Sequence, residues 1–409
     1  MRHIRWNLFA VFLLLVGLAG ALPASAVEVH GRSSTQYLWY NNIFTEEKQS
    51  EFGQYLNVSV TQLDKDNRIS VQGYGRGTYD LRDTGDGTRK LKGRLYYLYL
   101  DYRDMLDKVD LRFGRQFVNY AAGSAIIDGA QIELKNIGPV ALSIMGGRNV
   151  MFDLYGESTR SDDVVFGAAA SLRGYRNTDA EISYYRKDNK DGIARDQVGA
   201  SFKQYMLNSV KVYGNARYDF ANEAYSELLA GAKYYPNAEL IFTAERYQSY
   251  PTFDNTSVLA AFAVSRYKEN VFRADYTLNE KITMNTGYTA EEFETDDAKV
   301  YDIGFRVRPV EKIQVTLSYQ KRSGYGGKLN GGILEVSYES SKELDFAAGI
   351  HYDVYERDRI TGQETARKYW VGSNYKLAKN MSASVRIEDD VNARYDSDWQ
   401  GRVVLNYDF

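Results

Sequence analysis

The fold is decided by the C-terminal stretch Trp399-Gln400-Gly401-Arg402-Val403-Val404-Leu405-Asn406-Tyr407-Asp408-Phe409. Successive residues of a strand point to opposite faces, so Trp399, Gly401, Val403, Leu405, Tyr407 and Phe409 would share one face. The intervening residues, mostly polar, would share the other. One apolar and one polar face suit a strand that has lipid on one side and water on the other.

This segment resembles the closing strand of bacterial outer-membrane β-barrels, in which alternating apolar residues end in a terminal Phe. The resemblance implies that Val403, Leu405, Tyr407 and Phe409 form the signal that the barrel-insertion machinery recognises. It also implies a multi-pass β-barrel in the bacterial outer membrane, surrounded by outer-membrane lipid.

The N-terminal residues agree with export. Met1 to Ala26 carries Arg2 and Arg5, then an apolar run from Leu8 to Leu22, then Ala24-Ser25-Ala26. This order is typical of a cleaved signal peptide. The alternative, an N-terminal membrane anchor, is disfavoured because the run is short for a span and no stop-transfer pattern follows. We therefore expect residues 1–26 to be removed and residues 27–409 to form an outer-membrane β-barrel.

Composition narrows the function classes. The chain has no cysteine, which excludes disulfides, thiolate catalysis and thioether-attached haem on this chain. Its acidic and basic residues are interspersed and sum to a formal net charge of −3, so no basic stripe points to nucleic acid. The mean hydropathy is −0.48, and no apolar run after residue 26 approaches the roughly 20 residues of a membrane helix. A β-barrel fits such a polar average because only alternate residues meet lipid.

Short turn signals recur along the chain, from Asp64-Lys65-Asp66-Asn67 to Ala378-Lys379-Asn380, and alternate with longer polar connections such as Asn41 to Ser50. They predict an all-β fold: a single antiparallel transmembrane β-barrel of about 22 strands, within a range of about 16 to 24, with short periplasmic turns. The segment from Val27 to Tyr40 begins the first strand at once, so no plug domain is expected.

Alternation also predicts which side chains face the lumen. A soluble β-sandwich alternates too, but its apolar faces favour Leu, Ile and Phe, whereas these faces are rich in Tyr, Ala, Gly and Val. The inward positions carry both signs of charge, so strong ion selectivity is not expected. The candidate lumen-lining residues, which would contact a partner or a solute, are Asp110, Arg112, Lys211, Arg217, Glu245, Arg306, Glu335, His351, Arg386 and Arg402.

The first functional hypothesis follows from size. A barrel of about 22 strands is on the order of 40 Å across, and neither a plug nor an obvious constriction loop is apparent, since the longest connection lies around Val150 to Asp162. Such a barrel resembles the sheath subunits of porin-cytochrome electron conduits. The resemblance implies that it ensheathes a multihaem cytochrome, with periplasmic and extracellular cytochromes as partners and haem on those partners only.

The second hypothesis is a solute diffusion porin of fewer strands, about 16 to 18, with a modestly charged lumen. One loop would then fold inward, supplied by Val118 to Asp128 or by Asn149 to Asp163.

The third hypothesis, an outer-membrane enzyme, depends on His30 or His351, the only histidines after residue 26. His30 lies near Glu28 and Arg32, and His351 near Asp345 and Asp353, which is more typical of lumen-lining polar residues than of a catalytic base. We assign no catalytic, cofactor-binding or metal-binding residues.

Overall fold

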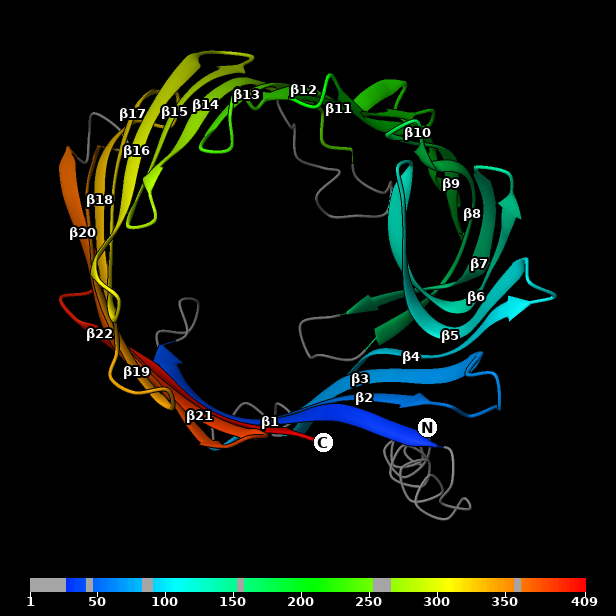
Figure 1. Cartoon of the computed structure of the whole chain (residues 1–409), viewed down its shortest axis with the longest axis horizontal. Coiled ribbons are helices and arrows are strands. Elements are labelled where there is room, and N and C mark those ends of the chain that lie inside the picture. Colours follow the sequence, from blue (N-terminus) through cyan, green and yellow to red (C-terminus); the bar gives the residue numbers. More distant parts are fainter. Residues whose placement is uncertain (1–26, 42–46, 83–90, 153–157, 253–265, 357–361) are drawn as a thin grey trace.

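The computed structural model describes residues 27–41, 47–82, 91–152, 158–252, 266–356 and 362–409, without the side chains of 158–162. They form a closed antiparallel barrel of 22 strands, a ring in Figure 1, which confirms the predicted fold class and strand number. The strand number of 16 to 18 in the porin hypothesis was wrong. The predicted signal peptide lies outside the described residues. The strands are β1 (Glu28–Asn41), β2 (Lys48–Thr61), β3 (Ile69–Asp80), β4 (Leu91–Met105), β5 (Val109–Tyr120), β6 (Gly123–Ile137), β7 (Val140–Phe152), β8 (Ser158–Tyr175), β9 (Thr178–Asn189), β10 (Gly192–Met206), β11 (Val210–Asp219), β12 (Ala224–Tyr234), β13 (Leu240–Ser249), β14 (Tyr267–Asn279), β15 (Ile282–Phe293), β16 (Asp297–Val310), β17 (Ile313–Gly324), β18 (Lys328–Glu339), β19 (Leu344–Glu356), β20 (Gln363–Ala378), β21 (Met381–Val391) and β22 (Asp398–Asp408).

The barrel closes between β1 and β22, where the pairing runs from Arg32↔Asp408 to Trp39↔Gly401. Both guanidinium contacts of Arg32 with Asp408 are short, at 2.5 and 3.0 Å. The backbone of Phe409 exchanges two further hydrogen bonds with Gly31, at 2.9 and 3.0 Å. The C-terminal stretch is therefore the closing strand, and its recognition by the insertion machinery stays a prediction.

Tight turns join the strands at the end of the barrel where β1 begins and β22 ends. Asn177 and Asn208 adopt left-handed φ values of 62° and 56° there, a conformation that Asn tolerates better than most residues. Both turns, between β8 and β9 and between β10 and β11, are of the short kind that the sequence predicts.

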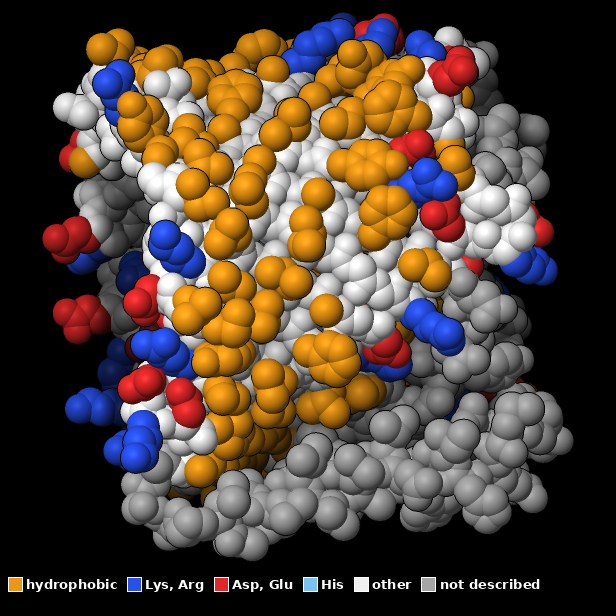
Figure 2. Space-filling view, turned by 90° about the vertical axis from the view of Figure 1, so that its right-hand side faces the viewer, with side chains coloured by type: hydrophobic (Ala, Val, Ile, Leu, Met, Phe, Trp, Pro, Cys, Tyr) orange, Lys and Arg blue, Asp and Glu red, His pale blue; other side chains and the backbone are white. Residues whose placement is uncertain are grey.

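The two faces of the wall follow from the register, because directly paired residues of neighbouring strands share a face. Val403, Leu405 and Tyr407 of β22 are on the outer face and remain 41, 39 and 44% exposed in the isolated barrel. Hydrophobic side chains cover much of the outer wall shown in Figure 2. None of the described residues forms a helix that is long and apolar enough to cross a membrane.

Candidate functional site: a hairpin folded into the lumen

The tip of the β5–β6 hairpin leaves the barrel wall. Pairing between β4 and β5 stops at Leu98↔Arg115, and pairing between β6 and β7 stops at Ile127↔Asn149. Pairing between β5 and β6 nevertheless continues to Tyr120↔Gly123. Residues 116–126, here called the inward hairpin, therefore have no neighbouring strand on either edge. Figure 1 shows them in turquoise inside the ring, alongside β7 to β9.

Glycines make the departure sterically feasible. Gly114 has a φ of 127°, which L side chains rarely adopt. Gly129 of β6 and Gly147 of β7 pair directly, and a Cβ on Gly129 would overlap the carbonyl oxygen of Gly146. The two backbones approach so closely that no side chain fits between them. The sheet can therefore bend at this height.

The underside of the inward hairpin packs on the inner wall. Val118 and Tyr120 of β5 and the adjoining Ile127 of β6 form a buried cluster with Val165 of β8 and Tyr185 of β9. Ile127 and Val165 have no exposed surface at all. This cluster resembles the core of a soluble sheet-on-sheet domain, since two layers bury apolar side chains between them. The hairpin is therefore held by packing and not only by its turn.

Polar side chains hold the tip itself. The backbone N–H of Ala121 donates to Glu181 Oε1 (2.6 Å), and that of Ala122 donates to Ser183 Oγ (2.9 Å). Arg217 Nε donates to the Ala121 carbonyl oxygen (3.0 Å). Beneath the tip lies Gly199 of β10, where any Cβ would overlap the backbone of the tip. Because these partners lie on β9 to β11, the tip is fixed to the wall several strands away from where the hairpin leaves it.

Side-chain contacts between β4 and β7 cross the part of the wall that the hairpin leaves. Tyr96 of β4 and Phe152 of β7 meet edge to face, with ring centroids 5.7 Å apart. The Arg94 guanidinium lies 4.8 Å from the Phe152 ring. At the base of the hairpin, Arg115 forms two hydrogen bonds with Asp128, at 2.7 and 2.8 Å. Contacts between β4 and β7 thus bridge the space that β5 and β6 vacate.

Arg217 contacts the hairpin and therefore faces the lumen. Since paired residues share a face, the strand register identifies the inward residues of the other strands. Arg306 and Arg402 are exposed, and neither has an ion pair or side-chain hydrogen bond among the described residues. All the sequence-predicted lumen residues are on the inward face: Asp110, Arg112, Lys211, Arg217, Glu245, Arg306, Glu335, His351, Arg386 and Arg402. Their contact with a solute or partner stays a prediction.

The predicted residues are dispersed and do not form one cluster. Arg112 Nε bonds Asp101 at 2.7 Å, and Arg386 Nε bonds Glu388 at 3.1 Å. Other contacts join Asp110 to Lys135, Glu245 to Tyr213, Glu335 to His351 and Lys211 to the rings of Tyr205 and Tyr213. Asp110, Arg112, Arg217 and Arg386 thus form ion pairs within the wall, whereas Glu245 and Lys211 contact neutral tyrosines.

A polar recess of about 740 Å³ lies on the inner wall of β1 to β3 and β22. Hydroxyl, amide and aromatic groups line it, among them Gln36, Tyr55, Asn57, Tyr74 and Asn406. Its ionic residues include Arg32 and Asp408, which bond each other. The recess is therefore hydrophilic and carries little unbalanced charge.

The predicted inward segment Val118 to Asp128 is confirmed, whereas the absence of a constriction loop was a wrong expectation. The other candidate, Asn149 to Asp163, is strand up to Phe152 and again from Ser158, and residues 153–157 lie outside the described residues. Sequence reasoning missed Glu181, Ser183 and Gly199. The glycines at 114, 129, 146 and 147, with the small residues at the tip, were the signal that could have located the bend.

The histidines contact carboxylates. His30 Nε2 lies 3.2 Å from Glu28 Oε2, and His351 Nε2 lies 3.5 Å from Glu335 Oε1. Neither of these contacts is to a hydroxyl nucleophile. Within the part of the chain that the structure describes, no group of acidic or histidine side chains is arranged to hold a metal ion.

The fold and the lumen define the class: the chain is a porin-like β-barrel of the bacterial outer membrane. No protein-family model and no curated protein matches it. Among solved structures it is similar to OccAB2 of Acinetobacter baumannii, with a TM-score of 0.50, 10% identity, and coverage of 94% of this chain and 98% of that one. OpdQ of Pseudomonas aeruginosa gives 0.47 and 12%, over 93% and 99%. OccK8 (OprE) of Pseudomonas aeruginosa gives 0.45 and 10%, over 94% and 98%. At these identities the likeness concerns the fold.

Proposed function

We propose that the protein is a solute diffusion porin whose lumen is narrowed by the inward hairpin. The single observation that carries this proposal is the attachment of Ala121 and Ala122 to the inner wall by Glu181, Ser183 and Arg217. A hairpin that is packed and hydrogen-bonded inside a barrel reduces the cross-section of the lumen that is open to water, but it does not block the lumen. Pore diameter is one of the properties that set the selectivity of a passive channel.

The solute class follows from the inner wall. Inward charges of both signs are present and several form ion pairs, as in Arg112 with Asp101, and the recess on β1 to β3 and β22 presents amides and hydroxyls. Small hydrophilic solutes with little net charge fit such a surface best, because no long-range potential favours one sign.

The cytochrome-sheath hypothesis depended on a lumen without a constriction. The inward hairpin removes that premise, because it occupies space beside β7 to β9 that a lumen-filling protein would need. The similarity to barrels of the porin type also favours the porin over the conduit. We therefore do not retain the sheath as a second proposal.

The test is reconstitution. The purified barrel in a planar bilayer should give stable, reproducible conductance steps, and proteoliposomes should swell in isotonic small sugars at a rate that falls with sugar size. The same preparation should be colourless. A stoichiometric haem absorption with co-purifying cytochromes, or a barrel that is silent although correctly folded, would contradict the proposal.

A further inference from the structure

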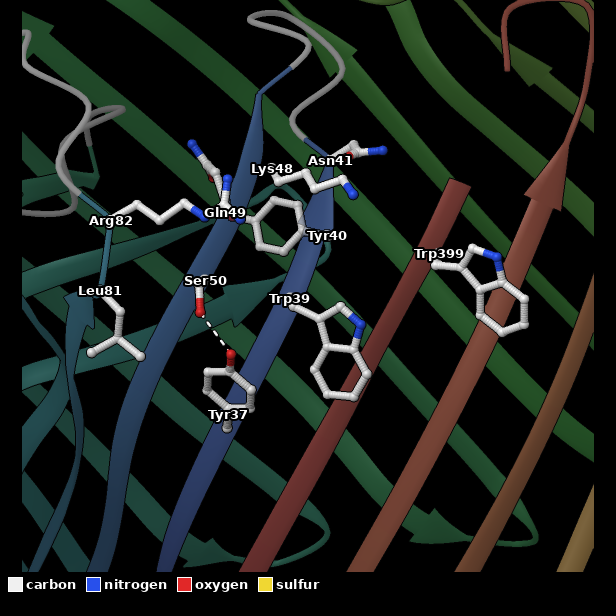
Figure 3. A pocket seen from close by; sticks show the side chains of 10 residues that line it. All are labelled: Tyr37, Trp39, Tyr40, Asn41, Lys48, Gln49, Ser50, Leu81, Arg82 and Trp399. Atoms are coloured by element: carbon white, nitrogen blue, oxygen red, sulfur yellow. Dashed lines mark hydrogen bonds between the residues drawn. The ribbon is translucent and has the colours of Figure 1, made fainter. Parts of the chain in front are cut away.

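A groove of about 540 Å³ (Figure 3) opens at the rim of the barrel opposite the end where β1 begins and β22 ends. It lies over the ends of β1, β2 and β22 and the residues that follow β3. Its lining combines aromatic, cationic and amide side chains: Tyr37, Trp39, Tyr40, Asn41, Lys48, Gln49, Ser50, Leu81, Arg82 and Trp399. The solute pathway through the lumen does not account for the groove, because Tyr37, Trp39 and Trp399 of its aromatic wall face outward. Tyr40 and Gln49, at its rim, share the inward face.

The apolar wall of the groove faces lipid. Tyr37 and Trp39 pair with Val403 and Gly401 of β22, which places them on the outer face with Trp399. The Trp39 ring lies over Gly401, where a Cβ would overlap it. In the isolated barrel Tyr37 is 37% exposed and Trp399 is 60% exposed. Large aromatic surfaces at this height are typical of the girdle at the level of lipid headgroups.

Two cationic side chains, those of Lys48 and Arg82, also line the groove. Lys48 begins β2, and Arg82 lies just after β3; both are exposed. Among the described residues, neither the Lys48 ammonium nor the Arg82 guanidinium forms an ion pair or hydrogen bond, whereas the Arg82 backbone N–H is fixed by Asp80 Oδ1 at 2.9 Å. The nearby Asp398 accepts a hydrogen bond from Asn41. Asp398 also interacts electrostatically with Lys48, without a direct ion pair. The groove thus offers two cationic groups that no described carboxylate contacts directly through their side chains.

We propose that this groove binds a phosphate-bearing lipid of the outer leaflet. The acyl chains would lie against Tyr37, Trp39 and Trp399, and the phosphate would contact Lys48 and Arg82. Arg presents a planar set of donors that matches phosphate oxygens, and Lys adds a point charge. The occupant follows from charge complementarity together with position: an aromatic wall at headgroup depth, in the same groove as two cations without a direct ion pair, fits an anionic amphiphile.

The outer face supplies a matched control. Lys299 of β16 and Lys321 of β17 also point outward and have no ion pair among the described side chains. They lie in another sector of the wall, separated from β1 by β18 to β22 and therefore away from Trp39 and Trp399 (Figure 1). A general attraction between lysines and anionic lipid would involve both pairs, whereas a built site would depend on Lys48 and Arg82.

The experiment uses the full barrel in mild detergent and measures lipid retention by native mass spectrometry and by titration. The probes are diphosphorylated lipid A and the same lipid with both phosphates removed. Each basic residue near a charged headgroup is worth about 1 kcal/mol, so the double variant K48Q/R82Q should bind the phosphorylated probe roughly 10- to 30-fold more weakly. Wild type should prefer the phosphorylated probe, and K299Q/K321Q should bind it like wild type.

Three outcomes would overturn the proposal: equal affinity of wild type for both probes, unchanged affinity in K48Q/R82Q, or an equal loss in K299Q/K321Q. Trp399→Ser serves as a second variant, with an expected loss of affinity for both probes. All variants should keep the heat-dependent gel mobility of a folded barrel. Channel conductance is measured in parallel, so that failure of lipid binding is distinguished from failure of the porin proposal.

Discussion

The sector from β5 to β10 and the sector from β16 to β21 use the same alternating pattern for opposite purposes. In the first, inward residues such as Val165 and Tyr185 are buried beneath the inward hairpin. In the second, inward residues such as Arg306 and Glu335 line the open side of the wall. The difference shows that an inward position in a wide barrel is not inherently polar. It becomes apolar wherever a second layer of sheet covers it.

The largest effect should come from removing the second layer. Replacing residues 117–126 with an Asn-Gly turn would join β5 to β6 at the height of the wall, since that pair favours tight hairpins. We expect single-channel conductance in planar bilayers to rise severalfold, because the lumen loses its narrowing element. Replacing the opposite turn, Tyr325 to Gly327, in the same way should leave conductance unchanged. Equal conductance of both variants and wild type would show that the hairpin does not limit flow.

The next effect concerns stability. Ile127→Ala removes a fully buried side chain from the cluster under the hairpin, and should lower the free energy of unfolding by about 2–5 kcal/mol. Ile350→Ala on the lipid face of β19, where the side chain is 45% exposed, should cost less, because no packed cavity results. Urea unfolding in phospholipid vesicles, followed by tryptophan fluorescence, measures both. Equal losses would mean that the cluster is not a packed core.

A smaller effect should follow from releasing the tip. Glu181→Ala leaves the Ala121 N–H without its carboxylate acceptor, which costs about 1–3 kcal/mol of local stability. We expect larger current fluctuations in single-channel records, while Glu181→Gln should lie between alanine and wild type because it keeps an acceptor oxygen. Glu245→Ala, whose partner Tyr213 is part of the wall, is the control. Identical noise in E181A and E245A would contradict the role of Glu181 as an anchor.

The sequence was sufficient for the wall, but for the inward hairpin it offered two candidate segments, Val118 to Asp128 and Asn149 to Asp163, and did not decide between them. Strand alternation and a terminal Phe409 depend on local residues, so β22 and the turns could be predicted. The inward positions of β5 change from Asp110 and Arg112 below Gly114 to Val118 and Tyr120 above it. That change was visible, but alternation alone does not reveal whether lipid, water or another strand will cover a face. The partners Glu181 and Arg217 lie far along the chain and meet the tip only through the bend at the glycines.

The smallest effect should concern ion selectivity, which we test in the sector from β16 to β21. Arg306 is an exposed inward cation without an ion-pair partner among the described residues, but it belongs to a wall that carries both signs of charge. Salt screens an isolated charge in a wet lumen over about 10 Å, so Arg306→Gln should move the reversal potential in a KCl gradient only slightly toward cation preference. Lys321→Gln, on the outer face of the neighbouring strand, should leave the reversal potential unchanged. A large shift of the reversal potential in R306Q would instead place Arg306 at the narrowest point of the pathway. The wall opposite the hairpin would then control permeation as strongly as the hairpin does.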